Sequence, residues 1–494
     1  PPRSTLFPYT TLFRSNTSTA TMTTSASTNP GTYFFTLSFG PIVSSIKTLI
    51  ILQPEISVAS QVGTIGGGYG GAGFEVTTSY VPNGSAGTIT WYTNSLGTTA
   101  SATPTGIWTT TTNVASDSSS ISITATTNAV AGSYYFRIGF GSTQSSVQIL
   151  TVIPVWMDVG SPRFTNQIGG FSFAFSPAGT PFLAFSEHSR GLKASVMEFV
   201  GGTWQLVGSA GFSAGAANDI TLVFSPSGVP YVAYSDFSYG FKAVVMKYSE
   251  GSWSPVGIEG PSVAGARYTK LAFSSSGTPY LAFSDAANGD KLTVMKYSEG
   301  SWNPVGSAGF SLGNIDREVS LLISPSGTPY VAYIDNSNSK KATVMEYSGS
   351  GWQPVGSAGF SEFRMRQPDL AISNEGILHV AYRDDYISPF KIIMQEFSGG
   401  TWVNFNTPKV SGGSAEAPSI AFSPNGILTA AFGELEDGIY KVRVMEYRSG
   451  SWVSIGFSSA SEGAASFSQL AFSPSGVPHV AYSEGGSLTV RCYK

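Results

Sequence analysis

From about residue 170 to its end, the chain repeats one pattern of apolar and polar positions roughly every 50 residues. In one copy, an apolar run at 222–224 leads through Ser-Pro-Ser-Gly to a second run at 231–234, and a third follows at 242–248. Short apolar runs bounded by turn residues are typical of β-strands, and this turn has the residue preferences of type I. The pattern predicts three antiparallel strands in each copy.

A tryptophan marks a fourth strand in every copy and recurs every 48 to 50 residues, as Trp156, Trp204, Trp253, Trp302, Trp352, Trp402 and Trp452. A period of this length with short strands is typical of a β-propeller. The strand at 155–160 precedes all others, and the last copy ends at Lys494 after its third strand. We therefore predict a seven-bladed propeller of four-stranded blades over residues 155–494, its ring closed by the N-terminal strand 155–160.

A second, longer repeat precedes the propeller. Residues 31–40 are echoed at 132–141, an offset of 101 residues, with short Thr-, Val- and Ile-rich strands between them. This predicts an all-β sandwich over residues 55–154, with Trp91 in its core and Tyr134 at a strand corner. Without a cysteine pair, the segment resembles bacterial immunoglobulin-like repeats, which implies an immunoglobulin-like β-sandwich. Residues 16–54 are expected to be the last third of a preceding, truncated repeat.

The first fifteen residues read PPRSTLFPYTTLFRS, which resembles the conceptual translation of a short-read sequencing adaptor. We expect residues 1–15 to be an artefact and leave them out of the fold prediction. The natural N-terminus, any signal peptide and further upstream modules are then expected to be missing from this sequence.

Composition narrows the function classes. The net charge is −4 and charged residues make up 11% of the chain, so nothing indicates nucleic-acid binding. No apolar run approaches the roughly 18 residues of a spanning helix, so direct membrane insertion is not expected. One cysteine, Cys492, excludes a disulfide framework and a cysteine-based zinc site. It occupies a repeat position otherwise held by Glu or Lys and is expected to be partly exposed. No cofactor or metal is expected.

In a propeller of this kind, the loops between strands two and three and between blades lie on one face. These loops differ from blade to blade, for example His188–Gly191 and Asp385–Phe390, whereas the turns on the opposite face are short and nearly identical. Variable loops on a rigid scaffold usually carry function. We therefore place the ligand site on this face, at the mouth of the central channel.

Arginine recurs on this face, four residues before the first apolar residue of strand one, as Arg267, Arg317 and Arg366. Arginine binds carboxylate or sulfate through two parallel hydrogen bonds. One hypothesis is a pocket for a uronate, sialate or sulfated sugar, built by these three with Tyr268, Arg364 and His188. The alternative is solvated arginines paired with neighbouring acids such as Asp316, Glu318 and Asp369.

Other repeated residues have mainly structural interpretations. The Trp column and a Met column are expected to pack between blades. Acids end every second strand and lysines begin six third strands, which predicts cross-strand ion pairs rather than calcium sites, because no loop supplies 6–8 oxygens. His379 and His479 replace aromatic residues and are expected to be structural. No nucleophile is recognisably spaced to His188, so no catalytic residue is predicted, although paired acids for glycoside cleavage stay open.

The repeat Ser326-Gly-Thr-Pro-Tyr-Val-Ala-Tyr333 with Lys341-Ala-Thr-Val-Met-Glu-Tyr347 resembles propeller repeats of large secreted bacterial surface proteins, and the architecture is similar to seven-bladed propeller lectins. The resemblance implies an extracellular, surface-displayed binding or adhesion module that contacts carbohydrate, with a monomeric propeller in a longer multidomain chain. Its partner would be a glycan or a surface protein. The alternatives are a protein-interaction or structural domain without a glycan ligand, and a carbohydrate-active hydrolase or lyase.

Overall fold

The computed structural model describes residues 31–39, 42–67, 69–126, 129–257, 260–386, 388–404, 410–456 and 459–494. The chain divides into two compact units, residues 1–154 and 155–494. The adaptor-like residues 1–15 and the first part of the expected truncated repeat, residues 16–30, lie outside the described ranges. No helix within those ranges has the length and apolar character needed to cross a membrane.

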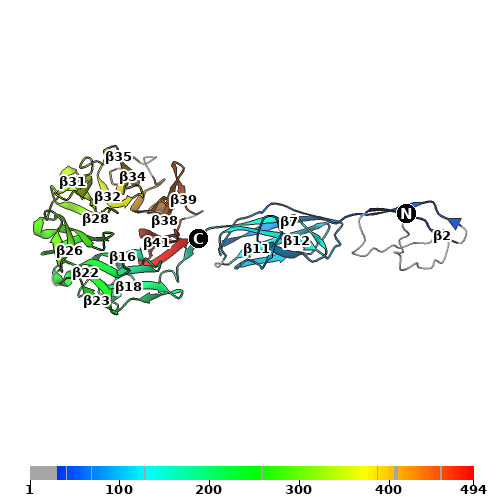
Figure 1. The fold of residues 1–494 in the computed structure, drawn as a ribbon, viewed down its shortest axis with the longest axis horizontal. Helices are drawn as coiled ribbons and strands as arrows, with labels where there is room; N and C mark the ends of the chain where they lie inside the picture. Colours follow the sequence, from blue (N-terminus) through cyan, green and yellow to red (C-terminus); the bar gives the residue numbers. More distant parts are fainter. Residues whose placement is uncertain are drawn as a thin grey trace. The chain divides into compact units, whose positions relative to one another are not determined.

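The second unit is a ring of seven four-stranded antiparallel sheets (Figure 1). Blades 1 to 4 consist of β16 (Ile168–Phe175), β17 (Pro181–Glu187), β18 (Lys193–Val200) and β19 (Thr203–Leu206); β20 (Ala217–Phe224), β21 (Pro230–Asp236), β22 (Lys242–Ser249) and β23 (Ser252–Pro255); β24 (Ala266–Phe273), β25 (Pro279–Asp285), β26 (Lys291–Ser298) and β27 (Ser301–Pro304); β28 (Ile315–Ile323), β29 (Pro329–Asp335), β30 (Lys341–Tyr347) and β31 (Trp352–Pro354). 

Blades 5 to 7 consist of β32 (Met365–Ile372), β33 (Leu378–Asp384), β34 (Lys391–Ser398) and β35 (Thr401–Asn404); β36 (Ala415–Phe422), β37 (Leu428–Glu436), β38 (Ile439–Arg448) and β39 (Ser451–Ser454); β40 (Ala465–Phe472), β41 (Pro478–Glu484), β42 (Ser487–Tyr493) and β15 (Trp156–Asp158). Four loops after the second strands hold 3-10 turns, η1 (His188–Arg190), η2 (Phe237–Tyr239), η3 (Ala286–Asn288) and η4 (Asn336–Asn338).

The first strand of each blade lies at the centre of the ring. These strands contact one another in chain order from β16 to β40, and β40 contacts β16 in turn. In blade 7, β15 pairs antiparallel with β42, from Trp156 opposite Tyr493 to Asp158 opposite Arg491. The structure confirms the predicted all-β, seven-bladed propeller with four-stranded blades.

The tryptophan column joins neighbouring blades. The Trp352 indole N–H donates to the Val305 carbonyl of the preceding blade at 2.7 Å, and its ring stacks on Phe310 with centroids 4.2 Å apart. Trp204, Trp253 and Trp402 combine a bond of this kind with a stacked Phe in the same way. The column is packing between blades, as the sequence predicts.

In the first unit, two sheets share the long strand β7 (Tyr69–Ser79). One contains β5 (Glu55–Val58), β7, β11 (Ser118–Ala125) and β10 (Ile107–Thr111). The other contains β6 (Ile65–Gly66), β14 (Gln148–Ile153), β12 (Gly132–Phe140), β8 (Thr88–Tyr92), β9 (Ala100–Ser101) and β13 (Thr143–Gln144). The remaining short strands pair as β1 (Gly31–Phe35) with β4 (Lys47–Ile51) and β2 (Ser38–Phe39) with β3 (Ile42–Val43).

The core of this unit contains Trp91, Phe74 and Phe136, all buried. The Tyr134 hydroxyl donates to the Val130 carbonyl four residues upstream at 2.6 Å. Both aromatic positions therefore have the roles that the strand pattern predicts.

Candidate functional site

The first strands of all seven blades line a central cavity of about 630 Å³. Each of these strands contains a β-bulge: in β20, Asp219 and Ile220 together oppose a single residue of β21. Six of the bulges hold a residue with left-handed backbone, namely Asp219, Tyr268, Arg317, Gln367, Ala417 and Phe467. A bulge redirects side chains, and here it sets which residues face the cavity.

Seven lining residues, one from the bulge region of each first strand, form what we call the bulge ring. It consists of Gly170, Asp219, Tyr268, Glu318, Gln367, Ala417 and Phe467. Several of them link successive blades. Asp219 Oδ2 accepts from the Tyr268 backbone N–H at 2.7 Å, and Gln367 Oε1 accepts from the Ala417 N–H at 2.8 Å. Polar side chains at the bulges therefore satisfy backbone groups that the irregular pairing leaves free.

Two residues farther along each strand lies a second set, the acceptor ring, which consists of Ser172, Thr221, Lys270, Ser320, Asp369, Ser419 and Gln469. Most of its members accept a hydrogen bond from the backbone of the next blade. Ser172 Oγ accepts from Leu222 N–H at 3.0 Å, and the same arrangement holds for Ser320, Asp369, Ser419 and Gln469. The acceptor ring thus gives hydrogen-bond partners to backbone N–H groups of the first strands, which lie at the open inner edges of the blades.

Lys270 departs from this pattern, because an ammonium group can only donate hydrogen bonds. Within the described ranges, its Nζ forms neither a hydrogen bond nor an ion pair. Its charge nevertheless lowers the pKa of the Asp219 and Asp369 carboxyl groups, against the larger effect of burial. Lys270 is therefore a half-buried donor whose charge acts on carboxyl groups of blades 2 and 5.

Three carboxyl groups in the cavity are poorly solvated. Burial raises the pKa of Asp369 to about 6, against the opposing effect of its hydrogen bond from the Ile420 backbone. Burial likewise raises the pKa values of Asp219 and Glu318. Asp219 keeps contact with solvent inside the cavity although protein atoms surround it. The cavity is therefore a polar site that holds three carboxyl groups with raised pKa values.

Phe467 adds an apolar wall. Its side chain lines the cavity and is 65% exposed, and its φ of 51° lies in the left-handed region. This backbone conformation is shared with five other bulges, so it belongs to the repeat, and the feature particular to blade 7 is the exposed aromatic ring.

Of the six residues proposed from the sequence, only Tyr268 lines the cavity. Arg267 and Arg317 are exposed at its rim, close enough to lower the pKa of the Tyr268 hydroxyl against the raising effect of burial. Within the described ranges, neither guanidinium forms an ion pair. The structure therefore brings these three residues together on blades 3 and 4.

The other three residues lie elsewhere or are already engaged. Arg366 forms an ion pair with Asp385 at 2.7 Å, and Arg364 Nε donates to the Asp385 carbonyl at 2.7 Å. His188 is exposed at the start of η1 and does not line the cavity. The sequence pattern located residues at or next to the bulges, whereas the cavity residues Asp219, Lys270 and Phe467 were missed.

The acids that end the second strands stabilise loops. Asp335 accepts from the Ser337 N–H at 3.0 Å, Asn338 Nδ2 at 2.8 Å and Thr343 Oγ1 at 2.9 Å. Asp335 lies opposite Lys341 in the strand register, yet in the described parts of the chain no such acid forms an ion pair with the lysine opposite it. The expected cross-strand ion pairs are therefore wrong, because the carboxylates turn toward loop donors.

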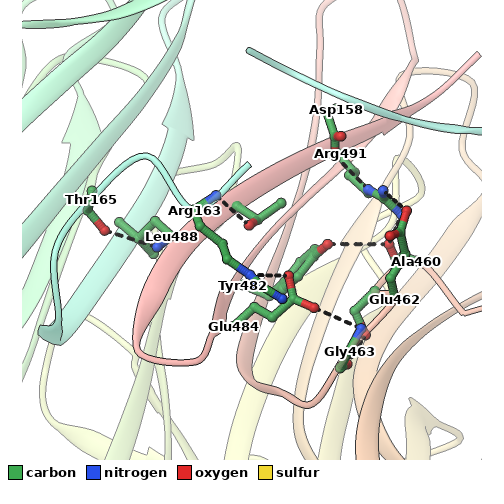
Figure 2. A network of polar contacts seen from close by, with 12 residues as sticks. Asp158, Arg163, Thr165, Ala460, Glu462, Gly463, Tyr482, Glu484, Leu488 and Arg491 are labelled. Atoms are coloured by element: carbon green, nitrogen blue, oxygen red, sulfur yellow. Dashed lines mark hydrogen bonds and ion pairs between the residues drawn. The ribbon is translucent and has the colours of Figure 1, made fainter. Parts of the chain in front are cut away.

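Blade 7 contains a second cavity of about 490 Å³ lined by a charged network (Figure 2). Arg491 occupies the strand position that Met holds in other blades. Its guanidinium donates to Asp158 Oδ1 of β15 at 2.7 Å and to the Ala460 carbonyl at 3.0 Å. Arg163 bonds Glu484 at 3.2 Å. These contacts tie the segment around β15 to β42 and to the loop before blade 7.

Cys492, beside Arg491, is 4% exposed. It packs in a cluster with Val159 and Leu183, and burial raises the pKa of its thiol. The expectation of partial exposure is wrong, because residues from the start of the propeller and from blade 1 cover this position.

No protein-family model and no curated protein matches the chain. Among solved structures, it is similar to a polysaccharide lyase of family PL25, an ulvan lyase bound to -[GlcA(1-4)Rha3S]-, at 11% identity over 67% of this chain and 93% of that one, with a TM-score of 0.47. It is also similar to AofleA from Arthrobotrys oligospora, at 12% identity over 62% of this chain and 91% of that one, TM-score 0.40.

A third similar structure is the SapL1 lectin in complex with alpha methyl fucoside, at 13% identity over 59% of this chain and 96% of that one, TM-score 0.39. Similarities at this level leave the function of the chain to be argued from its own residues.

Proposed function

We propose that this chain is an extracellular, surface-displayed binding module whose propeller binds carbohydrate in the central cavity, on the face of the variable loops. The observation that carries the proposal is the pairing of an exposed aromatic ring, Phe467, with unpaired polar groups in one cavity. Sugar rings have apolar C–H faces and hydroxyl groups at their edges, so they match such a lining. The cavity volume lies within the roughly 300–1,000 Å³ usual for ligand pockets.

The rim extends the site. Arg267 and Arg317 are exposed beside Tyr268 and would hold an acidic substituent of the glycan, such as a uronate, sialate or sulfate, at the cavity mouth. Arg366 and Arg364 already bond Asp385, so we assign them to positioning the blade 5 loop. His188 would contact only a ligand that extends over blade 1.

We also propose the arrangement that presents this site. The pairing of β15 with β42 supports a ring closed by the N-terminal strand 155–160. The two sheets around Trp91 support an immunoglobulin-like sandwich over residues 55–154 that acts as a stalk, with residues 16–54 as part of a preceding repeat and residues 1–15 as adaptor sequence.

A carbohydrate-active enzyme is the second candidate, favoured by Asp369. Its carboxyl has a pKa raised to about 6 and faces the same cavity as Lys270, and groups with such pKa values act as general acids. Incubation with the bound glycan, followed by assays for reducing ends and unsaturated products, separates this enzyme from a binding module.

A glycan array with the intact, folded chain tests the proposal. Neutral, uronate-containing, sialylated and sulfated glycans should be present together. We expect selective binding to one class of glycan. A blank array with folded protein would overturn carbohydrate binding and favour a protein-interaction or structural role.

A further inference from the structure

Two side chains on neighbouring blades line the cavity and each keep a polar atom without a hydrogen-bond partner in the described ranges. Asp219 Oδ2 accepts from Tyr268, but in the described ranges its Oδ1 has no hydrogen-bond partner. Lys270 on the adjacent blade 3 also lines the cavity, and its Nζ likewise has no hydrogen-bond partner in the part of the chain that the structure describes. A free acceptor on blade 2 and a free charged donor on blade 3 therefore line one cavity.

The fold does not require lysine at position 270. Serine holds the same position in three other blades, where Ser172, Ser320 and Ser419 each accept the backbone N–H of the next blade. Lysine cannot accept that bond. Its presence removes a contact between blades and places an ammonium group in the cavity, which indicates a role toward a ligand.

The charges around Lys270 select the kind of ligand. Asp219, Glu318 and Asp369 all line the cavity with this single lysine. An acidic group on the ligand would meet three carboxyl groups and one ammonium group there, and like charges repel. A hydroxyl group avoids this repulsion, because it donates to a carboxylate and accepts from an ammonium group.

We propose that Lys270 and Asp219 bind two adjacent hydroxyl groups of a neutral sugar residue, whose ring stacks on Phe467 in the cavity, while acidic substituents of the glycan stay at the arginine rim. The inference rests on the proposed carbohydrate binding and specifies its ligand. The cavity would then bind the neutral end of a glycan chain, and the arginine rim would bind its acidic groups.

The test uses calorimetric titration of the intact chain with methyl glycosides of glucose, galactose, mannose, fucose, arabinose and xylose, and with methyl glucuronide and galacturonide. If the array selects a longer glycan, its neutral-ended and uronate-ended forms replace this panel. Two variants remove the pair: Lys270→Ser, which introduces the residue of three other blades, and Asp219→Asn, which keeps an acceptor for Tyr268. Lys247→Ser, outside the cavity lining, is the control.

We expect neutral ligands to bind more tightly than uronides. Lys270→Ser and Asp219→Asn should each weaken neutral-ligand binding about tenfold or more, because each removes a hydrogen bond of a charged group. Lys247→Ser should bind as the unaltered chain does. Melting curves of Lys270→Ser and Asp219→Asn should show that both variants are folded at the temperature of the titration.

Three results would overturn the inference. Unchanged binding by Lys270→Ser and Asp219→Asn would leave carbohydrate binding intact but remove these residues from the site. Tighter binding of uronides, lost in Lys270→Ser, would show that the cavity takes the acidic group. No binding of any glycan by folded protein would overturn the inference and the proposed function together.

Discussion

His479 occupies a position that Tyr231, Tyr280 and Tyr330 hold in other blades. Its ring meets Phe175 edge-on at 4.8 Å and 75°, much as Tyr231 meets Phe273 at 4.9 Å and 74°. The imidazole therefore fills an aromatic packing site, as expected from the sequence. Burial lowers its pKa from 6.5 to about 4, so this structural residue makes stability depend on pH.

We expect His479→Tyr to reduce the loss of stability in acid. Between pH 6.5 and about 4, the unfolded chain binds a proton at His479 that the folded chain does not. The stability that neutral His479 contributes is therefore complete above pH 6.5. As the pH falls toward 4, the free energy of unfolding decreases by roughly 3 kcal/mol. Denaturant unfolding of both proteins across this range measures the difference.

The unaltered chain and His479→Tyr must be compared at each pH, because titration of Asp369 changes the free energy of unfolding in the opposite direction. Its pKa is raised from 3.8 to about 6, so between these values the folded chain holds the extra proton and stability falls as the pH rises. This term is common to both proteins and cancels in their difference. A difference that stays constant from pH 7 to pH 4 would contradict the account of His479.

At the scale of the strand, each fourth strand is held to the preceding blade by its tryptophan. We expect Trp352→Phe to lower the free energy of unfolding by about 1 kcal/mol, because stacking on Phe310 is kept while the Val305 carbonyl loses its donor. Denaturant unfolding measures this. Trp108→Phe, at a 68% exposed position, should change little, and equal effects of both substitutions would argue against the interblade bond.

β15 pairs with β42 in blade 7 and is the strand that closes the ring in our proposal. Replacing Trp156–Asp158 by Gly-Ser-Gly removes the pairing with β42 and the Trp156 bond to the Ile455 carbonyl at 3.1 Å. We expect the melting temperature of the propeller to fall by many degrees and proteolysis to become faster, because open blade edges are exposed. Replacement of Ser348 and Ser350 by Gly in the exposed turn 348–350, which keeps Gly349 with its φ of 89°, is the control. An unaltered melting curve for the β15 variant would refute closure.

Considering the whole molecule, the period of the repeat was enough to predict the propeller, because each blade repeats the same turn and tryptophan. The interior of the cavity was harder to predict. The arginine column lies at or next to the bulges, and Asp219, Tyr268 and Phe467, which line the cavity, lie within them. Lysine in place of serine at position 270 was the one signal in the sequence that could have marked the cavity.

The acids that end the second strands show a different limit of prediction from the sequence. Their regular spacing opposite lysines suggested ion pairs, but their partners include loop groups such as Ala287 N–H for Asp285 and Ser337 N–H for Asp335. Strand register is readable from a sequence, whereas the direction of a carboxylate at the end of a strand depends on loop conformation. The variable face is therefore fixed by hydrogen bonds that the sequence pattern does not reveal.

The central claim, that the cavity binds carbohydrate, is tested most directly by calorimetric titration of the glycan selected on the array into Phe467→Ala and Phe237→Ala. Alanine is found at the equivalent bulge as Ala417, and Phe237 is 61% exposed outside the cavity lining. We expect Phe467→Ala to weaken binding about tenfold or more and Phe237→Ala to leave it unchanged. Unchanged binding by folded Phe467→Ala would contradict the claim.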